Sequence, residues 1–408
     1  MKHFSAIRLL VALIIITSIS FTACNSPKPT VSIPTDTVVP STPTVAQPPM
    51  LNSSLVVPNT PTAQQAQASQ PTPVPAQPQV DQAPGNLLAM EWAGYDDPNY
   101  YKPFVDQHPN VKVDYSYVAT DAESFAKAEN NSDLDVIHPC VNYYRLFVEK
   151  GLVQPIDTSR IKNWSSIYPE FAKLGEVDGK QYFIPWDWGY EAILVRTDMV
   201  KNIPTSWADL WNNEYKGHLS IYDNGESAYQ IAALALGFDP DNATPEQDAQ
   251  IKQKLLDLKP NLVSYWSDPT EASNLMASGN LWVIASAWNE SYFSLYSDKK
   301  TPVKYVMPKE KPIASSCGYG ISSHTKNLDL VYDYINARIA PESLAKMTSD
   351  QGYGPSNKDA IPLIDPETVK IFNLDDPNIM NKIYLQRPIT EAQRQHFTDL
   401  WTEIKAAP

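Results

Sequence analysis

The sequence predicts an α/β protein from residue 87 onward, built mainly on parallel strands. Short apolar runs with strand character alternate with stretches that have helical periodicity and helix-capping residues. Several of these runs end in aromatic and turn residues, which is where an α/β sheet presents its binding crevice. Residues 87–408 number 322, which is enough for two ordinary domains.

The first elements alternate regularly. Residues 87–90 are an apolar run, residues 111–118 alternate between apolar and polar, and residues 134–137 are apolar except for Asp135. All three segments are expected to be strands. Between and after them, residues 98–107 and 122–129 are expected to be helical. A third helix is expected from Asn142 to Gly151, where the glycine ends it.

Later helices are indicated by their first residues. Ser206-Trp207-Ala208-Asp209 and Asp268-Pro269-Thr270-Glu271 resemble capping boxes, and the second has proline at the first helical position. Thr390 and Gln393 predict the start of a final helix. One face of that helix is apolar and is expected to lie in the core; it carries Phe397, Leu400, Trp401 and Ile404.

Residues 1–23 have the features of an export signal peptide. Lys2 and Arg8 precede an apolar stretch, and small residues precede Cys24. A cysteine at such a cleavage site resembles the bacterial lipobox, which implies that Cys24 is lipidated and anchors the protein to the membrane. Phe21 departs from the aliphatic residue usual in that motif. An ordinary secretory signal with a chance cysteine is the alternative.

Residues 24–86 are expected to form a disordered, proline-rich linker behind the lipidated cysteine. Fourteen of the 36 prolines fall here, and only Lys28, Asp36 and Asp81 are charged. Such a segment cannot bury enough apolar surface to offset its ordering entropy. It would let a folded body stand clear of the membrane surface.

The charge of the folded part excludes some partners. The whole chain has a net charge of −14; without the two positive charges of residues 1–23 and the single net negative charge of the linker, −15 remains. This argues against nucleic acid and anionic lipid as partners and favours the approach of cationic solutes. A role of the charge in solubility alone is the alternative. Outside residues 1–23, no apolar run is long enough to suggest a membrane span.

Enzyme chemistry has little support in the sequence. A glycine-rich phosphate loop, a G-x-S-x-G motif and an H-E-x-x-H motif are all lacking. The six histidines are scattered, and His138 beside Cys140 is too small a set for a zinc site. We therefore expect no catalytic residues, no metal and no cofactor.

Aromatic residues beside turn residues indicate a binding site. In an open α/β sheet such residues would line one crevice beyond the carboxyl ends of the strands. Aromatic faces together with carboxylates are the groups that bind an organic cation. For any single tryptophan, packing in the core is the alternative. The four segments are Trp92-Ala93-Gly94-Tyr95, Pro185-Trp186-Asp187-Trp188-Gly189, Ala287-Trp288-Asn289-Glu290 and Gln351-Gly352-Tyr353-Gly354.

Ordered motifs from residue 89 onward resemble the spermidine/putrescine-binding proteins of bacterial ABC importers. These proteins are a branch of the type 2 periplasmic-binding-protein fold. The most specific matches are Ser206-Trp207-Ala208-Asp209-Leu210-Trp211 with Glu214-Tyr215-Lys216-Gly217, and Gly352-Tyr353-Gly354-Pro355-Ser356-Asn357. Others are Glu91-Trp92, Asp135-Val136-Ile137-His138-Pro139-Cys140, the run from Glu149 to Asp157, and the run from Ile184 to Gly189.

The resemblance implies two α/β lobes with a ligand cleft between them and a discontinuous hinge. Lobe 1 would comprise residues 87–188 and 318–364, and lobe 2 residues 189–317 and 365–408. Crossovers would lie near 188–192, near 317–321 and around Ile364. The implied role is a solute receptor without enzymatic activity, a monomer that docks on ABC permease subunits. It would work in the periplasm or at the outer face of the cytoplasmic membrane.

The resemblance also implies a set of ligand-binding residues. Trp92, Trp288 and Tyr353 match ring positions that enclose a polyamine, and Gln386 matches a polar position near the end. Three acidic positions of the family are replaced, by Asn224, Ser227 and Cys317, although Glu226 is adjacent and Asp187, Glu191 and Glu290 could compensate. The full predicted set is Trp92, Tyr95, Cys140, Asn142, Tyr143, Trp188, Asn224, Glu226, Ser227, Trp288, Ser315, Cys317, Tyr353 and Gln386.

Cys140 and Cys317 both fall on ligand positions of the family. If the two loops meet, a disulfide could close the floor of the cleft in an oxidising compartment. Two separate buried thiols are the alternative, since the sequence does not supply the geometry that a disulfide requires.

Two alternatives to a polyamine receptor remain. The asparagine and serine replacements favour a neutral or anionic small molecule in the same kind of receptor, whereas the rings and the −15 charge favour a cation. A secreted enzyme on a similar two-lobed scaffold is the other alternative, although no catalytic set supports it.

Overall fold

Strand β1 (Leu87–Trp92) begins with four apolar residues, and every residue but its last is buried, Glu91 included. A computed structural model describes residues 85–408, which belong to one compact unit, Gln77–Pro408. The predicted signal peptide, Cys24 and residues 25–84 of the predicted linker lie outside the described residues.

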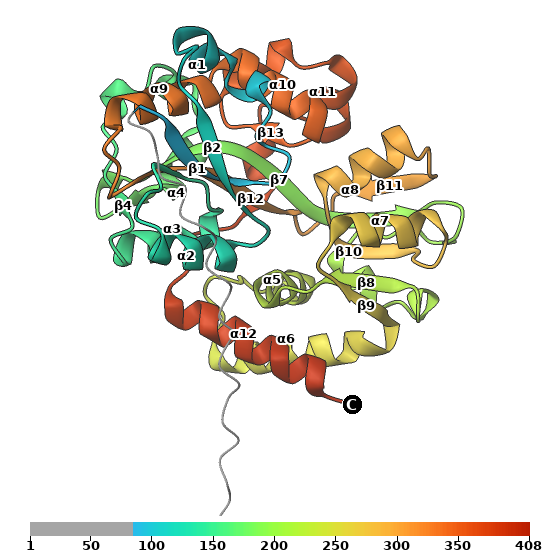
Figure 1. The fold of residues 1–408 in the computed structure, drawn as a ribbon. Helices are drawn as coiled ribbons and strands as arrows, with labels where there is room; N and C mark the ends of the chain where they lie inside the picture. Colours follow the sequence, from blue (N-terminus) through green and yellow to red (C-terminus); the bar gives the residue numbers. More distant parts are fainter. Residues whose placement is uncertain (1–84) are drawn as a thin grey trace, which may run out of the picture. The chain divides into compact units, whose positions relative to one another are not determined.

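A large mixed sheet organises the described residues (Figure 1). Its main strand order is β2-β1-β3-β12-β7-β10-β8-β9, while β4 and β14 pair with β12, and β11 and β13 pair with β7. The remaining strands after β1 are β2 (Val113–Val118), β3 (Val136–Ile137), β4 (Val153–Gln154), β7 (Phe183–Arg196), β8 (Leu219–Tyr222), β9 (Leu262–Trp266), β10 (Val283–Trp288), β11 (Val303–Val306), β12 (Ile313–Ser322), β13 (Gly354–Pro355) and β14 (Tyr384–Leu385). The short strands β5 (Glu176–Val177) and β6 (Lys180–Gln181) form a separate hairpin.

Strands β7 and β12 connect two groups of parallel strands. On one side β1 pairs in parallel with β2 and β3, and on the other β8 pairs in parallel with β9 and β10. Strand β7 runs antiparallel to both β12 and β10, and β12 runs antiparallel to β3. The prediction of a mainly parallel sheet is therefore wrong at the centre, because the two long strands that pass between the groups run against their neighbours.

Helices cover both groups of strands. The α-helices are α1 (Lys102–Gln107), α2 (Asp121–Asn130), α3 (Val141–Glu149), α4 (Pro169–Leu174), α5 (Gly225–Leu236), α6 (Pro245–Leu258), α7 (Pro269–Ala277), α8 (Asn289–Phe293), α9 (Leu328–Arg338), α10 (Pro341–Gln351), α11 (Pro366–Phe372) and α12 (Glu391–Ala406). Helices α5, α6 and α12 pack on one another, and α9 packs against α1 and α10 (Figure 1).

The capping residues act as their side-chain chemistry requires. The Thr390 side chain accepts a hydrogen bond from the backbone N–H of Gln393, and the Gln393 side chain accepts one from the backbone N–H of Thr390. This capping box starts α12. Ser206 and Asp209 form a second box, but it starts the short 3-10 helix η4 (Trp207–Trp211) rather than an α-helix. Asp268 caps α7 through the N–H of Thr270.

Apolar side chains gather in separate clusters on the two sides of the β7–β12 pair. One cluster combines buried residues of 87–192 with those of 314–383, and a second combines residues of 193–313 with the core face of α12. A third, smaller cluster lies under α7. Residues as late as Ile383 pack in the first cluster, and the core face of α12 packs in the second. The crossover expected around Ile364 stays a prediction.

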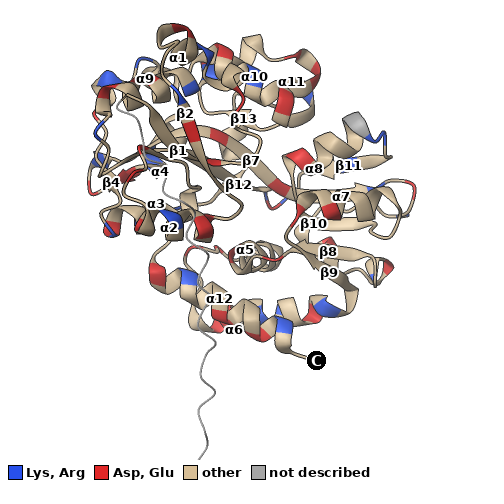
Figure 2. Ribbon diagram, viewed as in Figure 1, with Lys and Arg blue, Asp and Glu red and all other residues tan. Residues whose placement is uncertain are grey.

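Charges of both signs lie along the outer helices. Figure 2 shows acidic and basic residues interspersed on α6 and α12, and Lys252 of α6 pairs with Glu403 of α12 at 2.5 Å. Among residues 85–408, no helix has both the length and the apolar character needed to cross a membrane.

Candidate functional site

The candidate site is built on one face of the long strand β7. Successive side chains of a strand point to opposite faces. Trp186 and Trp188 point into the first apolar cluster and are at most 1% exposed. Asp187, Gly189 and Glu191 therefore share the other face, which places two carboxyl groups along a single line of the strand.

Strand β12 adds predicted site residues to the same face. Cys317 lies opposite Asp187 in the antiparallel register, and Ser315 lies opposite Gly189. Residues directly opposite each other in such a pair project to the same side of the sheet. The two central strands thus form a floor that carries Asp187, Gly189, Ser315 and Cys317.

Trp188, one of the predicted site residues, packs in the core. Its side chain is 1% exposed, its Nε1–H donates to the carbonyl of Pro355 at 3.0 Å, and its ring packs on Phe171 and Tyr190. The alternation of β7 directs its ring into the first apolar cluster, away from the face that carries Asp187. A role for Trp188 in ligand binding stays a prediction.

Tyr353 lies over the floor. A Cβ at Gly189 would come within 2.5 Å of the Tyr353 ring, so only glycine allows this ring to reach the strand. The Tyr353 hydroxyl donates to Glu290 at 3.3 Å, and the side-chain amide of Asn289 donates to the carbonyl of Gly352 at 2.8 Å. These contacts join the segment after β10 to the segment after α10.

Tyr95 completes this part of the site from the segment after β1. Its ring packs edge-on against Trp186 with centroids 4.9 Å apart. Burial raises the pKa of Tyr95 well above its ordinary value, and the negative charges of Asp187 and Glu290 raise it further. Burial likewise raises the pKa of Tyr353. The charges of Glu290, Tyr95 and Asp187 raise it further, in that order of size. Groups from both sides of the β7–β12 pair therefore converge on one place.

A buried ionic network supports these ring residues. Glu91 accepts hydrogen bonds from His138 Nδ1 at 2.5 Å and from Arg338 Nη2 at 3.0 Å, and all three side chains are 0% exposed. Burial alone would raise the pKa of Glu91, but the charges of His138 and Arg338 lower it. Arg338 also donates to the carbonyl of Tyr95, and Trp92 Nε1 donates to the carbonyl of His138. The network thus holds both segments that carry the rings.

A second group of carboxyl side chains extends the site toward α5. Ser227 donates its hydroxyl hydrogen to Glu191, and Gln230 donates to Glu226 at 3.0 Å. Gln386 is 5% exposed and donates to Gln230 at 2.8 Å. Burial raises the pKa of Glu191 to about 7 and that of Glu226 to about 8, the latter raised further by the charge of Glu191.

Asn224 and Asn142 have different local roles. Asn224 caps α5 by accepting from the backbone N–H of Ser227 at 3.0 Å, so its side-chain oxygen is already engaged. Asn142 lies in the first turn of α3, and its side-chain hydrogen bond with Glu226 lowers the pKa of Glu226. Its Oδ1 is buried and accepts no hydrogen bond from the described residues.

Tyr143 and Trp288 lie at the margins. Tyr143 is 8% exposed, and the guanidinium of Arg394 from α12 lies 5.7 Å from its ring centroid, so this ring already faces a cation of the chain. Trp288 is half-buried at the end of β10 and packs edge-on against Tyr222 and Trp266 at 5.0 and 5.1 Å. Trp92 is also half-buried and packs on the first cluster.

A disulfide joins Cys140 to Cys317. Cys140 is the N-cap of α3, and its backbone N–H donates to Asp121 at 2.8 Å. The N–H of Cys317 donates to Asp187 at 3.2 Å. Burial raises the pKa of both carboxyl groups to about 6.

Asp121 was missed by the sequence reasoning, and Asp187, Glu191 and Glu290 entered it only as compensating groups. The alternation of 186–191 carried a usable signal, since a buried strand that places Trp186 and Trp188 on one face must place Asp187 on the other. Asp121 carried none, because it lies 19 residues before Cys140 and is brought there only by the packing of α2.

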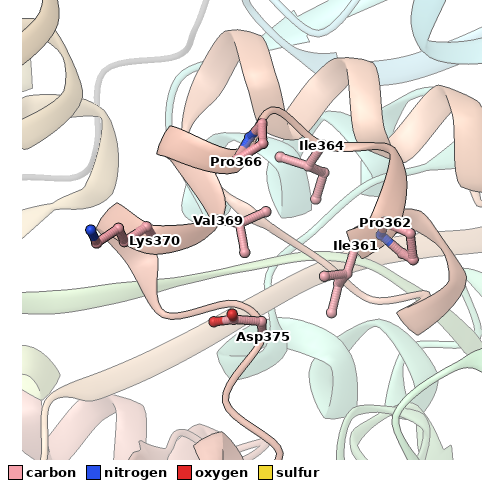
Figure 3. Close-up of a pocket in the computed structure, with 7 residues that line it drawn as sticks. All are labelled: Ile361, Pro362, Ile364, Pro366, Val369, Lys370 and Asp375. Atoms are coloured by element: carbon pink, nitrogen blue, oxygen red, sulfur yellow. The ribbon is translucent and has the colours of Figure 1, made fainter.

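Neither a candidate metal cluster nor the hollow beside α11 involves these residues. Within residues 85–408, no three His, Cys, Asp or Glu side chains are grouped to hold a metal ion. A hollow of about 550 Å³ lies in another place, between α11 and the 3-10 helix η8 (Lys358–Leu363). Figure 3 shows the side chains around it. It is lined by Ile361, Pro362, Ile364, Pro366, Val369, Lys370 and Asp375, none of which is a predicted site residue.

Comparisons with known proteins agree with this architecture. Residues 99–380 match the family of bacterial extracellular solute-binding proteins. The spermidine/putrescine-binding periplasmic protein of Escherichia coli is 30% identical over 285 residues, which cover 69% of this chain and 80% of that protein. A putrescine/cadaverine-binding protein of Pseudomonas aeruginosa is 23% identical, with 78% and 93% covered.

Solved structures show the same fold. The spermidine/putrescine ABC transporter substrate-binding protein of Streptococcus pneumoniae has a TM-score of 0.69 at 24% identity, and the match covers 78% of this chain and 98% of that one. A periplasmic binding protein of A. tumefaciens in complex with glucopine has a TM-score of 0.65 at 17% identity, with 78% and 99% covered. The predicted two-lobed periplasmic-binding-protein fold and the predicted family are confirmed.

Proposed function

We propose, because the chain belongs to the bacterial extracellular solute-binding protein family, that it is an importer receptor for a small organic cation such as spermidine or putrescine. It is an ABC transporter substrate-binding protein related to polyamine-binding proteins. Its family binds small molecules outside the cytoplasm and delivers them to permease subunits. That the bound molecule is an organic cation is our proposal.

The observation that carries this proposal is a set of buried carboxyl groups without a cationic partner. Asp187, Glu191 and Glu226 are 4%, 8% and 6% exposed. Among the residues that the structure describes, none of the three forms an ion pair with a lysine or arginine. Burying such groups is unfavourable unless a charge of the opposite sign or several hydrogen bonds accompany them. A bound ammonium group would supply that charge.

Aromatic faces around the carboxyl groups add to the case. Tyr95 and Tyr353 lie close enough to Asp187 and Glu290 for those charges to act on their hydroxyl groups. A desolvated cation over such a ring gains roughly 1–2 kcal/mol. Carboxylates fix the position of the ammonium, and the rings shield it from water.

The mechanism we propose is capture by closure of the two lobes. Glu226 and Ser227 lie on α5, which packs in the second apolar cluster. Tyr95 packs on the first cluster, and Asn142 lies on α3, whose neighbouring residues belong to the first cluster. A ligand that contacts both groups favours the closed form, because only that form offers all the contacts. Strands β7 and β12, which belong to both lobes, would carry the hinge.

The proposed setting is extracytoplasmic. We infer lipidation at Cys24, with the linker 24–86 as tether, from the sequence motif alone. The chain would act as a monomer, without cofactor or catalysis, at the outer face of the membrane. Relatives named as periplasmic binding proteins support an extracytoplasmic location.

A neutral or anionic ligand is the second candidate, and one observation favours it. With pKa values near 7 and 8, Glu191 and Glu226 are partly protonated at neutral pH and can then donate hydrogen bonds. The buried Oδ1 of Asn142 is an acceptor without a partner among the described residues. A polar uncharged solute could use both.

A thermal-shift screen at pH 8 separates the two candidates. The solutes are putrescine, spermidine, quaternary amines, amino acids and sugars, each at about 100 times the expected dissociation constant. At that concentration a true ligand adds about 2.7 kcal/mol to the free energy of unfolding. We expect a shift with the polyamines. No shift with any amine, together with a shift from a neutral solute, would replace the first candidate by the second.

A further inference from the structure

The Cys140–Cys317 disulfide connects two backbone positions that each hold a carboxyl group. On one side, the N–H of Cys140 donates to Asp121 Oδ1 at 2.8 Å. On the other, the N–H of Cys317 donates to Asp187 Oδ1 at 3.2 Å. The two half-cystines are half-buried, and they lie at the start of α3 and on the β12 floor of the site.

Each half-cystine lies at a point where the regular hydrogen bonding of the backbone begins or is interrupted. Helix α3 begins directly after Cys140, whose own side chain gives no cap to the helix. On β12 the pairing with β7 shifts register between Cys317 and Gly318, so the ladder of hydrogen bonds is interrupted there. An interrupted ladder lets the local backbone move more easily than a regular strand does.

We propose that this disulfide is a positioning element of the ligand site, which fixes Asp121 and Asp187 as two anchors for the positively charged ligand. Asp121 belongs to helix α2 and Asp187 to strand β7, so the two carboxyl groups lie on different elements. The cystine is the covalent connection between the two backbone groups that hold them. This inference rests on the proposed function, because it needs a cationic ligand.

The competing explanation is that backbone pairing alone sets the geometry. Cys140 and Cys317 form an isolated antiparallel bridge, and the N–H of Gly318 donates to the carbonyl of Pro139 at 3.1 Å. If these bonds suffice, the disulfide only stabilises the fold. A double-mutant cycle distinguishes the two roles, since it measures whether the effect of one change depends on the other.

The cycle combines Cys140→Ser/Cys317→Ser with Asp121→Asn in the full chain, and spermidine binding is measured by calorimetry. Asparagine keeps the acceptor for the Cys140 N–H and removes only the charge. With the disulfide present, Asp121→Asn is expected to weaken binding about tenfold. Without the disulfide, the same change is expected to weaken binding less than about twofold, because the carboxyl group is no longer held in place.

Asp365→Asn is the matched control. Asp365 also accepts backbone N–H groups, at the start of α11, and it is exposed. It should leave spermidine binding unchanged with and without the disulfide. An equal loss from Asp121→Asn in both backgrounds overturns the inference and leaves the proposed function standing. Absence of binding by the unaltered oxidised chain overturns the proposed function, and the inference with it.

Hydrogen exchange gives a second measurement if the serine variant folds poorly. The unaltered chain is compared before and after reduction by a phosphine, without ligand. We expect the amide hydrogens of residues 140 and 317 to exchange at least about tenfold faster after reduction, because their carboxylate acceptors are released. Unchanged protection of both amides, while the protein stays folded, contradicts the positioning role.

Discussion

Replacing Glu191 and Glu226 together with glutamine is expected to weaken spermidine binding by about 100-fold or more. Each carboxylate contributes roughly 2 kcal/mol to a charged hydrogen bond, and every 1.4 kcal/mol is about a tenfold change in affinity. Glutamine preserves the size of the side chain and can still accept the hydrogen bonds that Ser227 and Gln230 donate. Calorimetric titration at pH 8 measures the loss.

The same substitution should leave the fold intact and alter its pH dependence. In the folded chain both pKa values are raised, to about 7 and about 8 from 4.5. The stability that these groups contribute is therefore fully present below about pH 4.5 and is lost as the pH rises to about 8. The ligand-free variant should be more stable than the unaltered chain at pH 8 and similar at pH 4, as measured by urea unfolding.

Glu246→Gln/Glu271→Gln is the matched control for charge. Both residues are exposed in the first turns of α6 and α7, so the variant has the same net charge without touching the site. It should bind spermidine as the unaltered chain does. If the two double variants bind equally well, Glu191 and Glu226 do not hold the ligand.

The largest effect on stability is expected from Arg338→Met. This change leaves Glu91 fully buried without its guanidinium partner, and breaking a buried pair in this way costs about 3–5 kcal/mol. Arg338 also lies 4.2 Å from the Trp186 ring centroid and donates to the carbonyl of Tyr95. Denaturant unfolding at pH 7 measures the loss of stability.

Arg160→Met provides the comparison at the surface. Arg160 pairs with Asp329 at 2.7 Å, but the two side chains are 37% and 92% exposed. Water screens such a pair, so its loss should cost less than about 1 kcal/mol. Adding Glu91→Gln to Arg338→Met should recover part of the stability. A loss below about 1 kcal/mol for Arg338→Met would mean that the buried network does not stabilise the fold.

Local signals explain why much of the fold could be predicted. Thr390 and Gln393 start α12, and Phe397, Leu400, Trp401 and Ile404 lie buried along one face, as the spacing indicated. The strand at 134–137 is shorter in the structure, Val136–Ile137, because its pairing with β12 involves only these residues. Capping and periodicity act within a few residues, so the sequence contains them directly.

The site was harder to predict because its contacts join distant residues. Arg338 meets Glu91 across 247 positions, and no local pattern marks either residue as a partner. Asn224 forms an N-cap, and Ser227 donates a hydrogen bond to Glu191. We predicted from the resemblance that both replace acidic residues of the family. The carboxyl group beside Ser227 belongs to Glu191 of β7 and not to a residue of α5. Matching the residues of α5 to those of the family therefore does not reveal it.

The most direct test of the cation site is the number of protons released when spermidine binds. Calorimetry at pH 7 in two buffers of different ionisation enthalpy gives this number. Because Glu191 and Glu226 must ionise to pair with an ammonium group, we expect net proton release by the unaltered chain and a much smaller release by Glu191→Gln/Glu226→Gln, to which only Asp121 and Asp187 contribute. Tight binding without proton release, unchanged in that variant, would contradict the assignment of these carboxyl groups to the ligand.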